Sequence, residues 1–230
     1  MDRAEFDQFA DEYLSQHRSN IAVTGEDPEF FAEYKIAVLR KLLDAAAVVP
    51  RRIVDFGSGI GASMPFFRKY FPAAALTCAD ASPRSLELAA ARFPGAASFA
   101  EVAGSRVPAD DARFDVAFSA CVFHHIDHDE HVHWLGELNR VTASGGRLAI
   151  FEHNPYNPLT VRAVNTCPFD VNARLIRAAN LVKAARAAGW KSPEIRYHIF
   201  FPRALAALRG LEPSLGWLPL GGQYSLVASK

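Results

Sequence analysis

Short apolar strands alternate with helical segments between Arg52 and Glu152, and this alternation restricts the fold more than any other feature of the sequence. The expected strands are 52–56, 75–79, 97–102, 114–120 and 147–152, and the expected helices are 62–70, 83–93 and 128–141. Strands that alternate with helices form a parallel sheet with helices on both faces. Sheets of this kind bind ligands at the carboxyl ends of their strands. The sequence therefore predicts an α/β fold with a site at that edge.

The regions on either side of this core have a different pattern. Apolar residues at helical spacing predict two helices in the first fifty residues, near 6–14 and over 29–47. In the last eighty residues, helices are expected over 161–165 and 175–188, and strands over 195–201 and 223–228. No full crossover helix separates these two strands, so we expect an antiparallel pair that closes one edge of the sheet.

Composition and charge exclude several classes of protein. The chain has 230 residues, 50% of them hydrophobic, and its 25 Lys and Arg balance 25 Asp and Glu. This balance excludes a disordered chain and argues against a nucleic-acid binder, which needs surplus basic residues. No run of about 18 apolar residues predicts a transmembrane helix, and the acidic start is unlike a secretory signal. We therefore expect a cytoplasmic protein.

The three cysteines, Cys78, Cys121 and Cys167, lie far apart and show no C-x-x-C spacing. That spacing would indicate a zinc site or a redox motif. We interpret all three as buried apolar thiols, as expected inside the cell.

The segment from Asp55 to Ala62, DFGSGIGA, is the most informative motif. A strand enters a glycine-rich turn, where glycines permit tight turns and a close approach of ligand to backbone. Gly57, Gly59 and Ala62 fit a dinucleotide fingerprint, with Asp80 about 20 residues on as the ribose acid. Asp55 argues against this interpretation, because its carboxylate would repel a pyrophosphate. A ligand with an amino group and a sulfonium would not be repelled.

Four motifs resemble those of the class I S-adenosylmethionine-dependent methyltransferases, of the methyltransferase type 11/12-like group. VDFGSGIG resembles the first motif of that family, and Asp80 sits where the second-strand acid holds the ribose hydroxyls. FDVAFSACVFHHI (114–126) resembles the fourth-strand motif, and GGRLAIFEHNP (145–155) resembles the fifth. The resemblance implies S-adenosyl-L-methionine as cofactor and S-adenosyl-L-homocysteine as product.

The resemblance also implies the architecture. We expect an α/β, Rossmann-like, seven-stranded, mostly parallel sheet with an antiparallel C-terminal hairpin, helices on both faces and an N-terminal helical cap. The chain is then a single methyltransferase domain over 1–230. It divides into a cap at 1–50, a cofactor-binding core at 51–153, and substrate-side helices and closing strands at 154–230.

The expected cofactor contacts follow from matching motif positions. Asp55 would attract the cofactor's amino group, Asp80 would accept both ribose hydroxyls, and Ala81 would pack against adenine; ordinary strand-end or turn roles are the alternatives for the two acids. Ala103 stands where the family often has an acid, so backbone near Gly104 and Ser105, or the side chain of Glu101, would hold adenine. The full set is Asp55, Gly57, Ser58, Gly59, Gly61, Asp80, Ala81, Ser82, Gly104, Ser105 and Ala120, with Tyr13 and Lys35 from the cap.

The histidines supply the catalytic candidates. His124, His125 and His153 are expected near the cofactor, where one of them would act as general base; structural or pocket-lining roles are the alternatives. For Glu152 to Asn154, the alternative is a hydrogen-bonded strap that holds the turns after it. Five histidines crowd residues 124–133, but no closed ligand pattern accompanies them, so no metal site is expected.

The sequence predicts the methyl donor better than the acceptor. A small molecule is the preferred acceptor, with O-, N- or C-methylation left open, and no nucleic-acid partner is expected. The Leu-rich segment 202–222, with Trp217, Arg203 and Arg209, suggests peripheral membrane contact and a lipid or lipid-linked sugar acceptor. Packing on the sheet edge or in a homodimer is its alternative. A catalytically idle, cofactor-binding partner subunit and an NAD-dependent oxidoreductase are the other functional classes.

Overall fold

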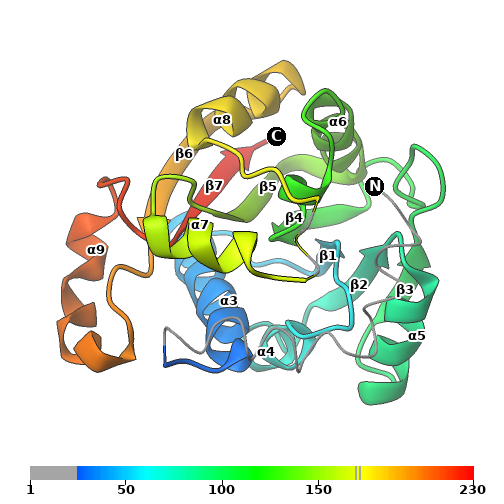
Figure 1. Ribbon diagram of the computed structural model, residues 1–230. Helices are drawn as coiled ribbons and strands as arrows, with labels where there is room; N and C mark the ends of the chain where they lie inside the picture. The colour runs from blue at the N-terminus through cyan, green and yellow to red at the C-terminus, as the bar shows by residue number, and fades with distance from the viewer. Residues whose placement is uncertain (1–24, 169, 171) are drawn as a thin grey trace.

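The computed structural model describes residues 25–168, 170 and 172–230, and its strands form one seven-stranded sheet (Figure 1). The strands are β1 (Arg52–Phe56), β2 (Ala75–Asp80), β3 (Ser98–Glu101), β4 (Phe114–Ala120), β5 (Thr142–His153), β6 (Lys191–His198) and β7 (Gln223–Ser229). Their order across the sheet is β3-β2-β1-β4-β5-β7-β6. The first five strands pair in parallel, and β7 pairs antiparallel with both β5 and β6. The predicted mostly parallel sheet with a closing antiparallel pair is confirmed.

Helices cover both faces of the sheet. The helices are α3 (Pro28–Ala45), α4 (Met64–Tyr70), α5 (Pro83–Arg92), α6 (His131–Val141), α7 (Pro158–Asn165), α8 (Ala178–Ala187) and α9 (Glu212–Leu215), with 3-10 helices η2 (Phe123–His125) and η3 (Arg203–Leu211). On one face α6 and α8 pack on the sheet; on the other, α3, α4 and α5 do so (Figure 1). Because helices cover both faces of the sheet, side chains on both faces are buried, and the strand sequences are almost continuously apolar.

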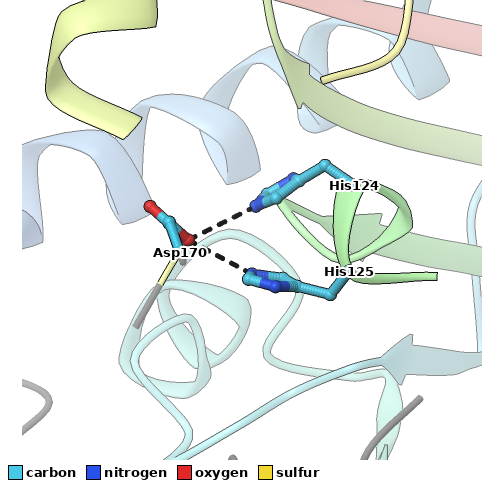
Figure 2. A group of neighbouring side chains, drawn as sticks. All are labelled: His124, His125 and Asp170. Carbon is cyan, nitrogen blue, oxygen red and sulfur yellow. Dashed lines mark ion pairs between the residues drawn. The ribbon is translucent and has the colours of Figure 1, made fainter. Parts of the chain in front are cut away.

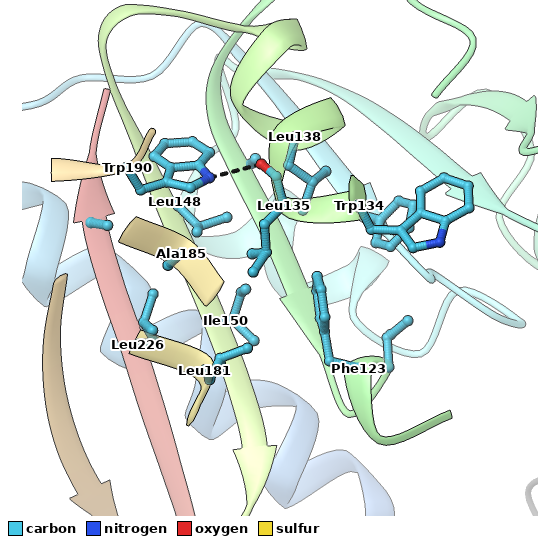
Figure 3. Close-up of a cluster of buried hydrophobic side chains, with 14 of the residues drawn as sticks. Phe123, Trp134, Leu135, Leu138, Leu148, Ile150, Leu181, Ala185, Trp190 and Leu226 are labelled. Carbon is cyan, nitrogen blue, oxygen red and sulfur yellow. Dashed lines mark hydrogen bonds between the residues drawn. The ribbon is translucent and has the colours of Figure 1, made fainter. Parts of the chain in front are cut away.

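The buried core on the α6 and α8 face sets the spacing of these helices (Figure 3). Leu135 and Leu138 of α6 and Leu181 of α8 belong to one buried cluster, and the Trp190 indole N–H donates to the Leu135 carbonyl at 2.9 Å. A buried indole N–H needs such a partner. The bond therefore ties the chain after α8 to the middle of α6.

Local signals account for most helix ends. The Ser82 hydroxyl accepts from the Ser85 N–H at 3.0 Å, and Pro83 occupies the first helical position of α5, so Ser82 is the N-cap of this helix. The first helix expected near residues 6–14 lies outside the described residues. The helix expected from 128 begins at His131, after turns at residues 128–130.

Several strand limits differ from the prediction, and the differences are largest for β5 and β6. β6 begins at Lys191 rather than at 195. β5 begins at Thr142 rather than at 147, because Thr142 pairs with Phe114 before a register shift opposite Val116. β6 ends at His198 rather than at 201, because Ile199 adopts the left-handed region with φ 63°. Such irregularities in strand pairing are not visible in the sequence pattern, so strand limits predicted from that pattern are shifted.

A strap of hydrogen bonds connects the turns after β5 with the segment before β7. The Asn154 side-chain amide donates to the carbonyls of Pro219 and Gly221, at 3.1 and 2.8 Å. The Asn157 amide donates to the Leu220 carbonyl at 2.8 Å. The structural alternative for the residues after β5, a hydrogen-bonded strap, is therefore confirmed for Asn154.

The segment 202–222 has two different sides. The Glu212 carboxylate accepts from the N–H groups of Phe200 and Phe201, so its polar side is held against the chain that leaves β6. The outer side carries exposed apolar side chains: Leu205, Leu208, Leu211, Trp217 and Leu220. In the part of the chain that the structure describes, no helix has the length and apolar character needed to cross a membrane.

Replacement of Gly221 by Ala should destabilise the protein, because a Cβ there would lie 2.4 Å from the His198 carbonyl oxygen and 2.8 Å from its nitrogen. Both are backbone atoms that cannot rotate away, so we expect a loss of about 1–3 kcal/mol in the free energy of unfolding. Urea denaturation followed by circular dichroism measures it.

Gly136→Ala is the matched control, since a Cβ at this position in α6 meets nothing within 4 Å. The propensity of Ala for helix interiors should raise the stability of this variant by up to about 1 kcal/mol. Equal effects of the two substitutions would contradict the close backbone approach at Gly221.

Candidate active site

The turn between β1 and α4 uses three left-handed glycines for two different purposes. Gly57, Gly59 and Gly61 have φ values of 74°, 51° and 76°. A Cβ at Gly57 would lie 2.2 Å from the Val122 side chain, and one at Gly61 would lie 2.6 Å from Met64. A Cβ at Gly59 would meet nothing within 4 Å. Gly57 and Gly61 therefore permit close packing, whereas Gly59 faces open space.

Asp80, at the carboxyl end of β2, fixes this turn. One carboxylate oxygen accepts from the Gly59 N–H at 2.7 Å, and the other accepts from the Ser82 N–H at 2.8 Å. Each carboxylate oxygen has two acceptor sites, so these bonds leave capacity for further donors. Asp80 thus joins the glycine turn to the start of α5 and presents an acid between them.

Asp55, at the end of β1, is a nearly buried acid with only 3% of its surface exposed. Burial raises the pKa of its carboxyl group to about 7, and the neighbouring negative charge of Asp80 adds to this. The Lys35 ammonium of α3 acts in the opposite direction. A cation placed beside Asp55 would favour its ionised form.

Cys121 occupies an unusual position directly after β4. Its backbone is left-handed, with φ 58°, and its N–H donates to the Phe151 carbonyl at 2.8 Å. The Lys35 ammonium donates to the thiol sulfur at 3.4 Å, and the Gln223 amide approaches it at 3.9 Å. Burial opposes ionisation of the thiol, but the charges of His153 and Lys35 outweigh it and lower the pKa of Cys121 to about 6. These neighbours favour the thiolate form of Cys121, whereas the sequence suggested an apolar thiol.

His124 is held between the carboxylates of Glu152 and Asp170, and Figure 2 shows it on the Asp170 side. Its Nδ1 lies 2.7 Å from Glu152 Oε2, and its Nε2 lies 3.7 Å from Asp170 Oδ1. Burial lowers the pKa of the imidazole, but Glu152 and Asp170 outweigh burial and raise it to about 10. An imidazole that is already protonated at neutral pH does not accept another proton, so a general-base role for His124 does not fit this geometry.

His125 and His153 lie on either side of His124. His125 Nε2 is 3.3 Å from Asp170 Oδ1, and burial lowers the pKa of this imidazole (Figure 2). The His153 ring centroid is 5.1 Å from that of His124, and His153 forms a hydrogen bond with Cys121. The three predicted histidines therefore do come together at the ends of β4 and β5.

The other predicted contacts are distributed around the glycine turn. Ala81 and Ser82 follow Asp80, and Ala120 ends β4. Gly104 and Ser105 lie in the exposed loop after β3, where the Ser105 carbonyl bonds to His133 at 2.6 Å. Tyr13 lies outside the described residues.

Four residues of this region were not predicted as site residues from the sequence. Cys121 had a usable signal, because it directly follows the fourth strand. Glu152 ends the fifth strand and was noted only as part of a motif. Gln223 and Asp170 had none, because their positions depend on the antiparallel pairing of His153 with Gln223 and on the connection between α7 and α8.

Comparison with known proteins identifies the central part of the chain. Residues 54–150 match the family described as "Methyltransferase domain". Demethylmenaquinone methyltransferase from Thermus thermophilus is 32% identical over 120 residues, which are 50% of this chain and 54% of that protein. Residues 54–150 are therefore a methyltransferase domain. The chain spans about half the length of the curated relatives it matches.

Solved structures show the same fold for the methyltransferase domain and its flanks. An S-adenosylmethionine-dependent methyltransferase from Thermotoga maritima has a TM-score of 0.68 and 18% identity, over 99% of both chains. Phosphoethanolamine N-methyltransferase 2 from Haemonchus contortus, in complex with S-adenosyl-L-methionine, has a TM-score of 0.54 and 16% identity. The match covers 78% of this chain and 48% of that one. At these identities the likeness concerns the fold alone.

The free energy of unfolding should fall as the pH rises, because the buried carboxyl group of Asp55 then loses its proton. The pKa of Asp55 is about 7 in the folded chain and about 3.9 in an unfolded one, so the folded state binds the extra proton in this window. Stability contributed by that proton is lost as the pH rises through the window. Asp55→Asn should therefore gain stability relative to wild type between pH 5 and pH 8, by on the order of 2 kcal/mol.

Chemical denaturation of both proteins at several pH values measures this difference. Asp110→Asn, at an exposed acid, is the control and should differ from wild type by the same amount at every pH. A pH-independent difference at Asp55 as well would contradict the raised pKa.

Proposed function

We propose that this chain transfers a methyl group from S-adenosylmethionine to a small-molecule acceptor that binds among Lys35, Cys121, His153 and Gln223. We call these four side chains the acceptor cluster. The observation that carries the proposal is their position beside the glycine turn. Val122, the neighbour of Cys121, packs directly on Gly57, and Lys35 acts on both Asp55 and Cys121.

The residues around the turn fit the cofactor. Gly59 faces open space, Asp80 retains acceptor capacity, and Asp55 provides a buried acid that a cationic ligand would help to ionise. S-adenosylmethionine carries a sulfonium and an amino group, and when bound it supplies an activated methyl group. We assign the ribose hydroxyls to Asp80 and the amino group to Asp55. The supporting contacts are assigned to Gly57, Ser58, Gly61, Ala81, Ser82, Gly104, Ser105 and Ala120.

The acceptor cluster offers complementary groups to a polar acceptor. The side-chain oxygen of Gln223 is buried and has no hydrogen-bond partner among the described residues, so it can accept a hydrogen bond from a hydroxyl or amine of the acceptor. The Lys35 ammonium neutralises negative charge that develops on the acceptor as its proton leaves. Positioning of the acceptor supplies much of the rate, since the leaving group is already activated.

His153 is the histidine assigned to proton removal. His124 is held protonated between Glu152 and Asp170, and His125 is directed at Asp170. In its neutral form His153 can take the acceptor's proton, and the Cys121 sulfur that it contacts would then stabilise the imidazolium that forms. The pair would then work as a base and its charged orienting partner.

Two variants should separate cofactor binding from chemistry. Asp80→Ala should weaken S-adenosylhomocysteine binding at least tenfold in calorimetry, because two backbone N–H groups and the ribose hydroxyls lose an acceptor. His153→Gln should bind the cofactor normally but form S-adenosylhomocysteine at least tenfold more slowly from an acceptor pool that includes demethylmenaquinol-type compounds.

Asp110→Asn is the matched control for both measurements and should behave as wild type. Normal cofactor affinity in Asp80→Ala would overturn the ribose assignment. Cofactor binding without product formation from any acceptor would instead favour a catalytically idle partner subunit.

A lipid or lipid-linked acceptor at a membrane surface is the second candidate, and the exposed apolar side of segment 202–222 favours it. Trp217 is 74% exposed, and four leucines of the same segment are exposed as well. The Asn154 and Asn157 straps join this segment to the chain directly after His153, so it lies next to the acceptor cluster. Arg203 is exposed there, whereas Arg209 is engaged by Glu26. Basic residues beside exposed Leu and Trp are typical of segments that bind at the lipid interface.

Liposome flotation tests this second candidate. The wild-type chain should float with vesicles that contain anionic lipid, and Trp217→Asp should reduce the floating fraction several-fold, because a charge at the interface opposes insertion. Val132→Asp, at an exposed apolar residue of α6, is the control and should float as wild type does. Absence of the wild-type chain from the floating fraction would exclude the lipid-surface alternative.

A further inference from the structure

His124, His125 and Asp170 bring three metal-ligating groups together at the end of β4 (Figure 2). We propose that they bind one divalent transition-metal ion. Glu152, which contacts the ring nitrogen of His124 that would not bind the ion, holds this histidine in place. Binding of this ion does not depend on the proposed methyl acceptor. No metal is expected here from the sequence, because Asp170 lies far along the chain from the two histidines.

The spacing of the ligand atoms suits such an ion. One nitrogen from each histidine and one oxygen of Asp170 all lie within 4.8 Å of one another. His125 Nε2 is 3.3 Å from Asp170 Oδ1, and His124 Nε2 is 3.7 Å from the same oxygen. Metal bonds of about 2.1 Å in a tetrahedral arrangement place ligand atoms roughly 3.4 Å apart. Only small side-chain movements separate the observed positions from a coordinating set.

Glu152 provides the support that metal-bound histidines commonly have. Its Oε2 lies 2.7 Å from His124 Nδ1, which directs the opposite nitrogen of the ring at Asp170. Its other oxygen accepts from the N–H groups of Val122 and Phe123, so the fully buried carboxylate has a fixed orientation. A carboxylate bonded to the outer nitrogen of a histidine holds the ring's tautomer and strengthens it as a ligand.

The backbone holds Asp170 in place opposite the histidines. The Arg174 N–H donates to the His124 carbonyl at 2.7 Å, and the Ala173 N–H donates to the Asp170 carbonyl at 2.9 Å. These bonds tie the connection between α7 and α8 to η2. The site is therefore assembled from two segments that the fold holds together, with both carboxylates and His124 nearly inaccessible to solvent.

The charged groups around the site suit a divalent ion. Two buried carboxylates, Glu152 and Asp170, flank the histidine pair. A divalent ion bound by two neutral imidazoles would balance the charge of both carboxylates. A buried charge without an opposite charge nearby is energetically unfavourable, so neutralisation of the two carboxylates by the ion would stabilise the metal-bound form. Two imidazoles with one carboxylate suit zinc, iron, cobalt or nickel rather than magnesium or calcium.

Equilibrium dialysis of the full chain against Zn²⁺, with metal analysis, tests the site. Wild type should bind one Zn²⁺ per chain, and His125→Gln and Asp170→Asn should each weaken binding at least tenfold. His128→Gln is the matched control, because His128 is an exposed histidine of the same segment that points at a backbone carbonyl. It should bind Zn²⁺ as wild type does.

Glu152→Gln tests the supporting role without removing a ligand. Its amide oxygen can still accept from Val122 and Phe123, but its NH₂ would donate to His124 Nδ1 and put the ring proton on Nε2. The expected loss in Zn²⁺ affinity is about 10–100-fold. Circular dichroism and S-adenosylhomocysteine calorimetry, both expected to match wild type in His125→Gln, separate a metal defect from misfolding and from failure of the proposed function.

Two results would overturn the proposal. One is equal Zn²⁺ affinity in wild type and in the His125→Gln, Asp170→Asn double variant, including the case in which neither binds. The other is a thiolate charge-transfer band in the Co²⁺-loaded protein that disappears in Cys121→Ser, which would place the ion on sulfur. If Co²⁺ binds as proposed, its spectrum should contain weak bands in the visible region and no thiolate charge-transfer band.

Discussion

The buried carboxylate of Glu152 organises the edge of the sheet where the candidate site lies. It lies one residue before the end of β5, accepts hydrogen bonds from two N–H groups of the chain that leaves β4, and bonds His124 at 2.7 Å. Burial of a carboxylate costs several kcal/mol unless its oxygens are satisfied, so these partners must keep their places. The path of the chain after β4 then determines where Val122 meets Gly57 and where Cys121 meets Lys35. The Glu152 carboxylate therefore fixes the relative positions of the glycine turn, the Cys121 sulfur and the histidine pair.

Charges alternate across the site in a way that the overall composition does not reveal. The acids Asp55 and Asp80 face the glycine turn, Lys35 lies between Asp55 and Cys121, and the His124 imidazolium lies between two carboxylates. Each strongly buried charge has an opposite charge within reach, as a low-dielectric site requires. A cationic cofactor would add positive charge where two acids stand close together. The chain-wide balance of 25 basic and 25 acidic residues says nothing of this order.

The parts of the fold that were predicted correctly are those whose signal is local. β1 and β4 match their expected limits, because strands buried on both faces have continuous apolar runs bounded by turn residues. β5 and β6 were displaced, because a register shift near Thr142 and the left-handed Ile199 depend on partner strands. In the site, the glycine turn and the two acids were foreseen from their motif. The ionised Cys121 and the protonated His124 were not, because each state depends on charges brought in from other elements.

The sequence by itself determined the alternating core, the class of cofactor and the glycine turn, since periodicity reports burial and glycine reports backbone freedom within a few residues. Only the tertiary structure decided which side chains act together. Lys35 reaches Cys121 across 86 residues, Gln223 reaches it across 102, and Asp170 meets the His124–His125 pair through the connection between α7 and α8. Such contacts leave no periodic trace in the sequence. They arise because strand order and helix packing bring distant segments to one edge of the sheet, where their charges change one another's protonation.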